Sequence, residues 1–198
     1  MKDHNRNSLK ERIRELVIKY QFEKKLNELL KIKKDISELE ILLLFENVRT
    51  EWSIAEDLKR IKEIDPNLLP EKDRKLYDIL LQGTEIANVY EKILDKLVDI
   101  VEREGINKVE KNFPEYFNSA IREVLPKPDD YRSFKKRTWE YLKTINKELL
   151  SDSTDPLYWF FESLYEAMEY HEQRAFDHIE KEIQEIYGED KINNLKEK

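Results

Sequence analysis

The sequence contains no cysteine, and this absence removes several kinds of chemistry at once. Without thiols the chain makes no disulfide, no cysteine-ligated zinc or iron–sulfur site and no thiol nucleophile. A chain without cysteine suits a reducing compartment, so we expect a cytoplasmic protein. There are only two methionines, while charged residues reach 40%, and this balance is typical of thermophile proteins.

Glycine is nearly as rare as cysteine. The three glycines, Gly83, Gly105 and Gly188, lie far apart in the chain, whereas phosphate-binding loops need several within a few residues. The longest apolar runs, such as Ile41 to Phe45, fall far short of the ~20 residues that a membrane span requires. We therefore expect no cofactor and no membrane-spanning helix.

What the sequence does contain is helical periodicity. Apolar residues recur every three or four positions, no useful stretch alternates with a period of two, and no Asn-Gly or Asp-Gly hairpin signal occurs. These patterns predict an all-α fold, an irregular multi-helix bundle with a long N-terminal helix and a long C-terminal helix. Shorter helices are predicted between them, at about 50–64, 70–104, 114–124 and 130–149.

The long N-terminal helix is predicted to run from about residue 8 to about residue 47. Ser8 and Glu11 match a capping box at its start, and no glycine or proline interrupts the chain before Pro66. From Phe22 onward the apolar residues lie on a different side of the helix, and any kink is expected further on, near Lys34. At 1.5 Å per residue such a helix is roughly 60 Å long, more than one compact domain needs.

The predicted break at Pro126 to Pro128 is the best candidate for a boundary inside the chain. It separates an N-terminal helical region, residues 1–125, from a C-terminal helical region, residues 129–198, and we expect both to pack in one assembly. The long C-terminal helix is predicted over 156–187. Whether Gly83 breaks the 70–104 helix is left open, because an internal glycine costs only ~1 kcal/mol.

The first candidate site is a protein interface on the N-terminal helix. Apolar residues there follow a coiled-coil-like spacing of seven and end in five consecutive apolar residues, which cover more than one helix face. Such a segment must be buried, either inside its own bundle or against another chain, and the two readings weigh equally. The proposed interface residues are Phe22, Leu29, Ile36, Leu43, Leu44 and Phe45.

The second candidate site is a basic face on the predicted helix 130–149. Its residues, Arg132, Lys136, Trp139, Lys143 and Lys147, are spaced by three or four and therefore share one side, within the segment 131–147. Cations around an aromatic ring can hold phosphates while the ring stacks on a base. The favoured alternative is an ordinary outer face of the helix, with Trp139 packed on a neighbour.

The C-terminal helix carries two histidines that we examined as metal ligands. His171 and His178 are seven apart, with Glu182 four further on. Met168 and Ala175 occupy the positions where di-iron helical bundles place glutamate. We therefore expect core histidines satisfied by a Tyr or Glu, and no metal site.

The aromatic run at the start of that helix, which includes Trp159, Phe160 and Phe161, is predicted to lie in the core, with Tyr and Glu residues around it on the solvated side. No catalytic motif is recognisable, so no catalytic residue is predicted and an enzyme is the less favoured reading.

Charge is distributed unevenly along the chain. Residues 1–34 hold eleven Lys and Arg against five Asp and Glu, while residues 151–198 hold five against thirteen. Taken together, the sequence favours a non-enzymatic interaction or assembly subunit of a cytoplasmic complex, with a protein partner or a second copy of itself. The alternative is a nucleic-acid-binding accessory protein that uses the basic face at 131–147.

Overall fold

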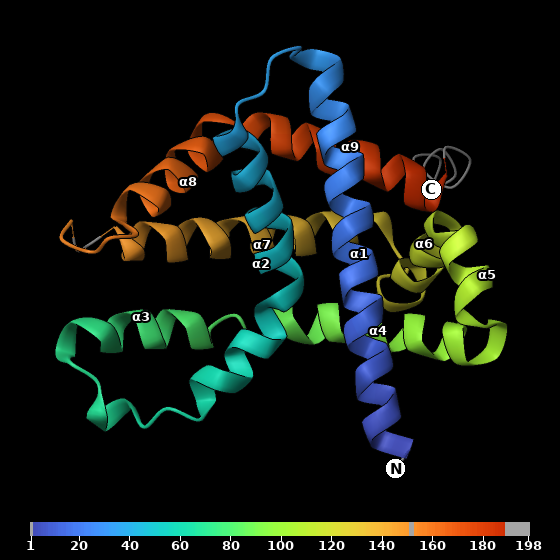
Figure 1. Cartoon of the computed structure of the whole chain (residues 1–198), viewed down its shortest axis with the longest axis horizontal. Helices are drawn as coiled ribbons and strands as arrows, with labels where there is room; N and C mark the ends of the chain where they lie inside the picture. The colour runs from blue at the N-terminus through green and yellow to red at the C-terminus, as the bar shows by residue number, and fades with distance from the viewer. Residues whose placement is uncertain (1, 151–152, 189–198) are drawn as a thin grey trace.

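The computed structural model describes residues 2–150 and 153–188. Within these residues the chain forms nine α-helices and a single turn of 3₁₀ helix, and contains no strand. The predicted all-α bundle is confirmed, and its helices cross at varied angles (Figure 1). The helices are α1 (Lys2–Ile32), α2 (Glu38–Lys62), α3 (Glu71–Leu81), α4 (Thr84–Glu104), α5 (Ile106–Lys111), α6 (Phe113–Val124), α7 (Pro128–Leu149), α8 (Tyr158–Tyr170) and α9 (Glu172–Tyr187).

The prediction of one continuous helix over 8–47 is wrong, because the chain reverses direction between α1 and α2. Ser37 begins α2 with a capping box: its hydroxyl accepts the Glu40 N–H at 3.2 Å, and the Glu40 carboxylate accepts the Ser37 N–H at 2.8 Å. Ser8, to which the sequence reading gave this role, lies inside α1. The predicted helix 50–64 is the second half of α2. The two helices form an antiparallel hairpin whose turn stands at the top of the molecule (Figure 1).

The predicted C-terminal helix over 156–187 is also divided. His171 ends α8 and begins α9, with backbone angles φ −102° and ψ 10° that interrupt the helix. No glycine or proline marks this point in the sequence. As a result α8 and α9 meet at a corner, and both pack along α7.

Gly83 does break the predicted helix 70–104. α3 ends at Leu81 and α4 begins at Thr84, with Gly83 between them. The short helix α5, which the sequence reading did not predict, follows α4 at once, after Gly105 at φ 86°. That positive φ is one that residues with a side chain rarely adopt.

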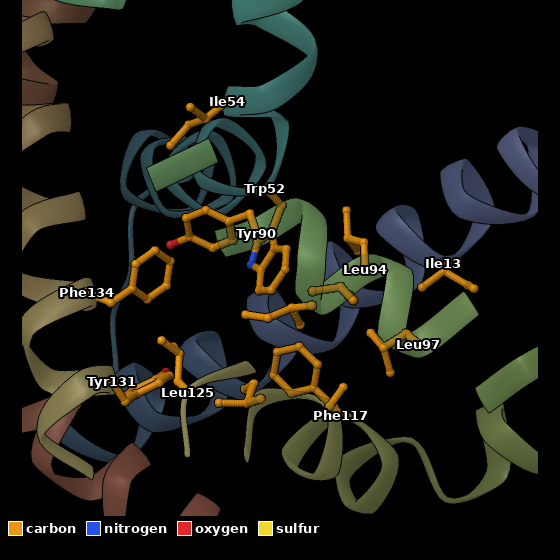
Figure 2. Close-up of a cluster of buried hydrophobic side chains, with 14 of the residues drawn as sticks. Ile13, Trp52, Ile54, Tyr90, Leu94, Leu97, Phe117, Leu125, Tyr131 and Phe134 are labelled. Carbon is orange, nitrogen blue, oxygen red and sulfur yellow. The ribbon is translucent and has the colours of Figure 1, made fainter. Parts of the chain in front are cut away.

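The hydrophobic core is built around α4, which packs against α1, α2, α6 and α7. Figure 2 shows Tyr90 of α4 between Trp52 and Phe134, with ring centroids 4.7 Å and 4.9 Å away. Trp52 also meets Phe117 of α6 at 5.7 Å. Offset and edge contacts of this kind are favoured between aromatic rings. Phe134 lies beyond the Pro126–Pro128 break, so the core draws on both sides of that predicted boundary.

None of the helices in the described part of the chain combines the length and the apolar character that a membrane crossing requires.

Candidate interaction surface

Large apolar side chains are exposed on both sides of the turn between α1 and α2, and we call them together the tip surface. It consists of Leu30 and Ile32 at the end of α1, and Leu39, Ile41, Leu42 and Phe45 at the start of α2. Their exposed fractions run from 36% to 61%. Six of the eleven large apolar side chains that are exposed in the described residues therefore come from one hairpin end.

The predicted interface residues lie at this end of the hairpin, with different degrees of burial. Leu43 is buried at 8% exposure, whereas Phe45 is exposed at 36%. Phe22, Leu29, Ile36 and Leu44 are half-buried. The rings of Phe22 and Phe45 meet edge to face at 5.4 Å across the hairpin. The hairpin therefore covers only part of the apolar run 41–45 and leaves the rest in solvent.

A hydrogen bond between two charged side chains joins the two ends of the turn beside the tip surface. Lys33, in the turn, donates to the Glu40 carboxylate at 2.6 Å. This hydrogen bond, helped by the Ser37 N–H and hydroxyl, lowers the pKa of Glu40 to about 2. The carboxylate is therefore charged at neutral pH and joins the two ends of the turn. The apolar side chains belong to the end of α1 and to the capped start of α2, and not to the turn itself.

Three residues of the predicted basic face on α7 contact α9. Arg132 donates to Glu180 at 2.5 and 2.9 Å, and Lys143 donates to Glu172 at 3.0 Å. The Lys136 ammonium lies 5.0 Å from the centre of the Phe176 ring, a cation–π contact.

The remaining two residues of that face differ in exposure. Trp139 is half-buried with its indole Nε1 shielded from solvent, and Lys147 is exposed. Three of the five residues of this face thus contact the chain's own C-terminal helices.

The two histidines occupy different environments. The prediction of a core position is wrong for His171, which is exposed at the α8–α9 corner because the helix breaks there. His178 is half-buried between two carboxylates and meets the expectation only in part: its Nδ1 lies 2.8 Å from Glu28, whereas its Nε2, 3.4 Å from Glu182, has no hydrogen-bond partner. Among the described residues no three His, Asp or Glu side chains are grouped to hold a metal ion.

α8 carries the second exposed feature, which the sequence reading placed wrongly. Trp159 is 72% exposed and is not a core residue, because the buried side of α8 is set by Leu164 and Met168 instead. Tyr170 at the other end of α8 is 85% exposed. Trp159, Glu166 and Tyr170 are spaced by seven and four residues and so share one side of the helix. We call this side, together with the neighbouring Glu162, the α8 face.

Sequence reasoning missed a buried charge network between the helices. Glu51 of α2 accepts hydrogen bonds from Lys135 of α7 and from the Tyr90 hydroxyl. Across the same core, the Tyr131 hydroxyl donates to Glu182 of α9 at 2.8 Å. Each of these residues looks like an ordinary helix position in the sequence, since only the tertiary fold brings them together.

The network sets the protonation of its members. Burial opposes ionisation of Glu51, but the positive charges of Lys135 and Lys25 outweigh it and lower its pKa. Burial likewise opposes the charged form of Glu182, and the neighbouring His178 and Lys135 lower its pKa below the ordinary value. Burial and the nearby carboxylates raise the pKa of the Tyr90 and Tyr131 hydroxyls. All four groups therefore keep one charge state across neutral pH.

Two hollows adjoin the network, and Gln21, Phe117 and Tyr131 line both of them. Each has an accessible volume of only about 10 Å³, room for about one water molecule. Small-molecule sites usually measure about 300–1,000 Å³. With its charges paired and little space beside them, the network has the properties of an internal support that fixes α1, α2, α7 and α9 relative to one another.

No protein-family model, curated protein or solved structure matches the chain. What the fold and the surface define is a class: an all-α helical bundle with a paired, buried charge network and an apolar hairpin end exposed to solvent.

Proposed function

We propose that this protein is a non-enzymatic interaction subunit of a cytoplasmic complex and that it binds a protein partner through the tip surface. The observation that carries the proposal is the gathering of six large apolar side chains at one hairpin end. Contiguous apolar patches on a folded protein typically mark interaction sites. The lack of cysteine supports a reducing compartment.

The rigidity of the tip supports the same function. A pre-organised surface binds with less loss of conformational freedom than a loop that must order on contact. The Ser37 capping box and the Lys33–Glu40 hydrogen bond provide this order at the turn. The aliphatic residues Leu39 and Leu42, each about half exposed, would form the apolar centre of such an interface.

A photoreactive residue at position 42 tests the proposal in cells of the native host. We expect illumination to join the protein covalently to another protein molecule, whether a second copy or a different chain. The matched control is position 68, because Leu68 is also apolar and exposed, at 82%, but lies in the turn between α2 and α3, far from the tip (Figure 1). If position 42 gives no more intermolecular adduct than position 68, the proposal is wrong.

A further inference from the structure

The two hollows beside the charge network differ in what lines them. One is lined mainly by polar side chains from four helices, and we call it the polar hollow. Its polar residues are Tyr20, Gln21 and Lys24 of α1, Asn118 of α6, Tyr131 of α7 and Glu182 of α9. The other is lined mainly by apolar side chains, among them Trp52, Ile93 and Phe134. A polar ligand is therefore favoured in the polar hollow, since apolar cavities stay dry.

The side chain of Gln21 is buried at the polar hollow without a partner. Gln21 is only 7% exposed, and its side-chain amide forms no hydrogen bond with any residue that the structure describes. The described side-chain atoms that are both sealed from solvent and unpartnered belong to Arg14, Trp139 and His178. The Gln21 amide is not among them, so it opens onto the hollows that it lines. A buried amide that lacks a hydrogen bond destabilises a fold, so this amide needs a partner.

One oxygen of the Glu182 carboxylate also lacks a donor. Glu182 is 4% exposed, and its Oε2 accepts the Tyr131 hydroxyl at 2.8 Å. Its Oε1 lies 3.4 Å from His178 Nε2, but these two atoms form no hydrogen bond, and no other described residue donates to Oε1. The carboxylate is charged at neutral pH, because the nearby positive charges outweigh burial and lower its pKa. A buried charge needs hydrogen bonds even more than a buried neutral group does.

The polar hollow has the size and the chemistry of a site for one water molecule. Its accessible volume of about 10 Å³ is just enough for a single water, and a buried water needs two to four polar partners. We propose that the polar hollow binds one water molecule, which accepts a hydrogen bond from the Gln21 amide and donates one to the Glu182 carboxylate. The side-chain carbonyl of Asn118, which lines the same hollow, is the acceptor for its second hydrogen. The water thereby joins α1 to α6 and α9.

The water adds to a small set of contacts that hold α1 against α9. The backbone of α1 packs mainly against α2 and α4. Its long side chains reach α9: Lys24 donates to Glu185, and the Glu28 carboxylate lies 2.8 Å from His178 Nδ1. Lys24 and Glu28 are half-buried, whereas Gln21 and Glu182 are buried. The water is therefore the buried part of the contact between α1 and α9.

A high-resolution crystal structure of the full chain tests the site directly. We expect electron density for one water oxygen about 2.7–3.2 Å from the Gln21 amide nitrogen, the usual length of such a hydrogen bond, and within hydrogen-bond distance of the Glu182 carboxylate. A hollow without density, or a Gln21 amide that bonds another residue directly, overturns the proposal. A peak surrounded by oxygen atoms alone overturns it as well, because the ligand is then a cation and not water.

Gln21→Met tests what the water contributes to stability. Methionine resembles glutamine in length and helix propensity but has no N–H to donate. Because the variant leaves the water and the Glu182 carboxylate with one partner fewer, we expect its Tm to fall by about 4–8 °C in thermal unfolding. If the amide has no partner in the wild type, its removal instead raises the Tm, so an unchanged or higher Tm overturns the proposal. The matched control is Gln184→Met, at an exposed position of α9, which should change the Tm by no more than about 2 °C.

Discussion

The ring of Tyr141, on α7, lies directly against the backbone of Gly83, and its hydroxyl donates a hydrogen bond to the Leu80 carbonyl at 2.7 Å. A Cβ atom at position 83 would overlap two carbon atoms of that ring and its hydroxyl oxygen. The φ of Gly83 is −73°, an ordinary value. Glycine is therefore needed here for the close approach of α7 and not for an unusual backbone angle.

Gly83→Ala is expected to lower the free energy of unfolding by about 1–3 kcal/mol, the usual range for overpacking a tight contact. The penalty should disappear in a Tyr141→Ala background, because the clashing ring is gone. A double-mutant cycle from urea denaturation measures this coupling.

Gly105→Ala is the matched control for that cycle. It meets no atom within 4 Å but is strained at φ 86°, so its cost should be the same with or without Tyr141. Equal costs for Gly83→Ala in both backgrounds would contradict the packing explanation.

Glu51→Gln is expected to destabilise the protein by about 3 kcal/mol at neutral pH, because it leaves Lys135 charged and nearly buried without its partner. The double variant Glu51→Gln with Lys135→Met should recover most of that loss. Thermal or urea unfolding checks both. Lys92→Met, which removes an exposed cation with no ion pair among the described residues, should change stability by no more than about 0.5 kcal/mol.

The destabilisation by Glu51→Gln depends on pH, because the pKa of Glu51 is lowered in the folded protein. A carboxyl group whose pKa is lower in the folded protein than its unfolded value of about 4.3 stabilises the fold above that value. The contribution is lost as the pH falls through the folded pKa. The difference in unfolding free energy between wild type and Glu51→Gln should therefore be constant from pH 6 to 8 and shrink in acid; a difference that grows below pH 4 would contradict the ion pair.

At the hairpin turn, the carboxyl group of Glu40 is expected to titrate at about 2 in an NMR experiment. Lys33→Met should raise this pKa more than Ser37→Ala does, since the Lys33 hydrogen bond is the largest cause of the shift. The stabilisation is present above the unfolded value and disappears as the pH falls through about 2. An ordinary pKa near 4.3 for Glu40 in the wild type would show that the Lys33–Glu40 hydrogen bond does not form in solution.

Charge reversal on α7, Lys136→Glu with Lys143→Glu, is expected to act on stability. It removes the Lys143–Glu172 hydrogen bond and the Lys136–Phe176 contact, which together are worth about 1 kcal/mol. Binding to a single-stranded oligonucleotide at about 50 mM salt should be no stronger in wild type than in the variant. Salt-dependent binding that the variant loses would instead support nucleic-acid recognition by this face.

The sequence predicted helices well where apolar periodicity was long and ended at glycine or proline, as in α7, which begins at Pro128. It failed where a helix ends without either residue. The reversal before Ser37 occurs among Lys33, Lys34 and Asp35, which are tolerated inside helices, and the apolar spacing continues on both sides. The only local signal was the motif from Ser37 to Glu40, and a similar motif at Ser8 lies inside a helix.

The candidate surfaces were predictable only in part. Five consecutive apolar residues at 41–45 indicated an interface or a buried helix, but periodicity does not show which sides a neighbouring helix covers. Trp159 illustrates the limit: an aromatic residue between other aromatics looks like core, and the pairing of α8 with α7 turned it outward. Glu51 and Lys135 are 84 residues apart, and no local pattern joins them.

The continuity of α2 has a mechanical consequence. Its first turns carry the exposed Leu39 and Leu42, and three turns later the same helix places Glu51 against Lys135 in the middle of the bundle. A helix transmits bending and rotation along its axis because every turn is braced by the next. A change in the tilt or rotation of α2 at the hairpin end would therefore also displace Glu51 relative to Lys135 in the centre of the protein.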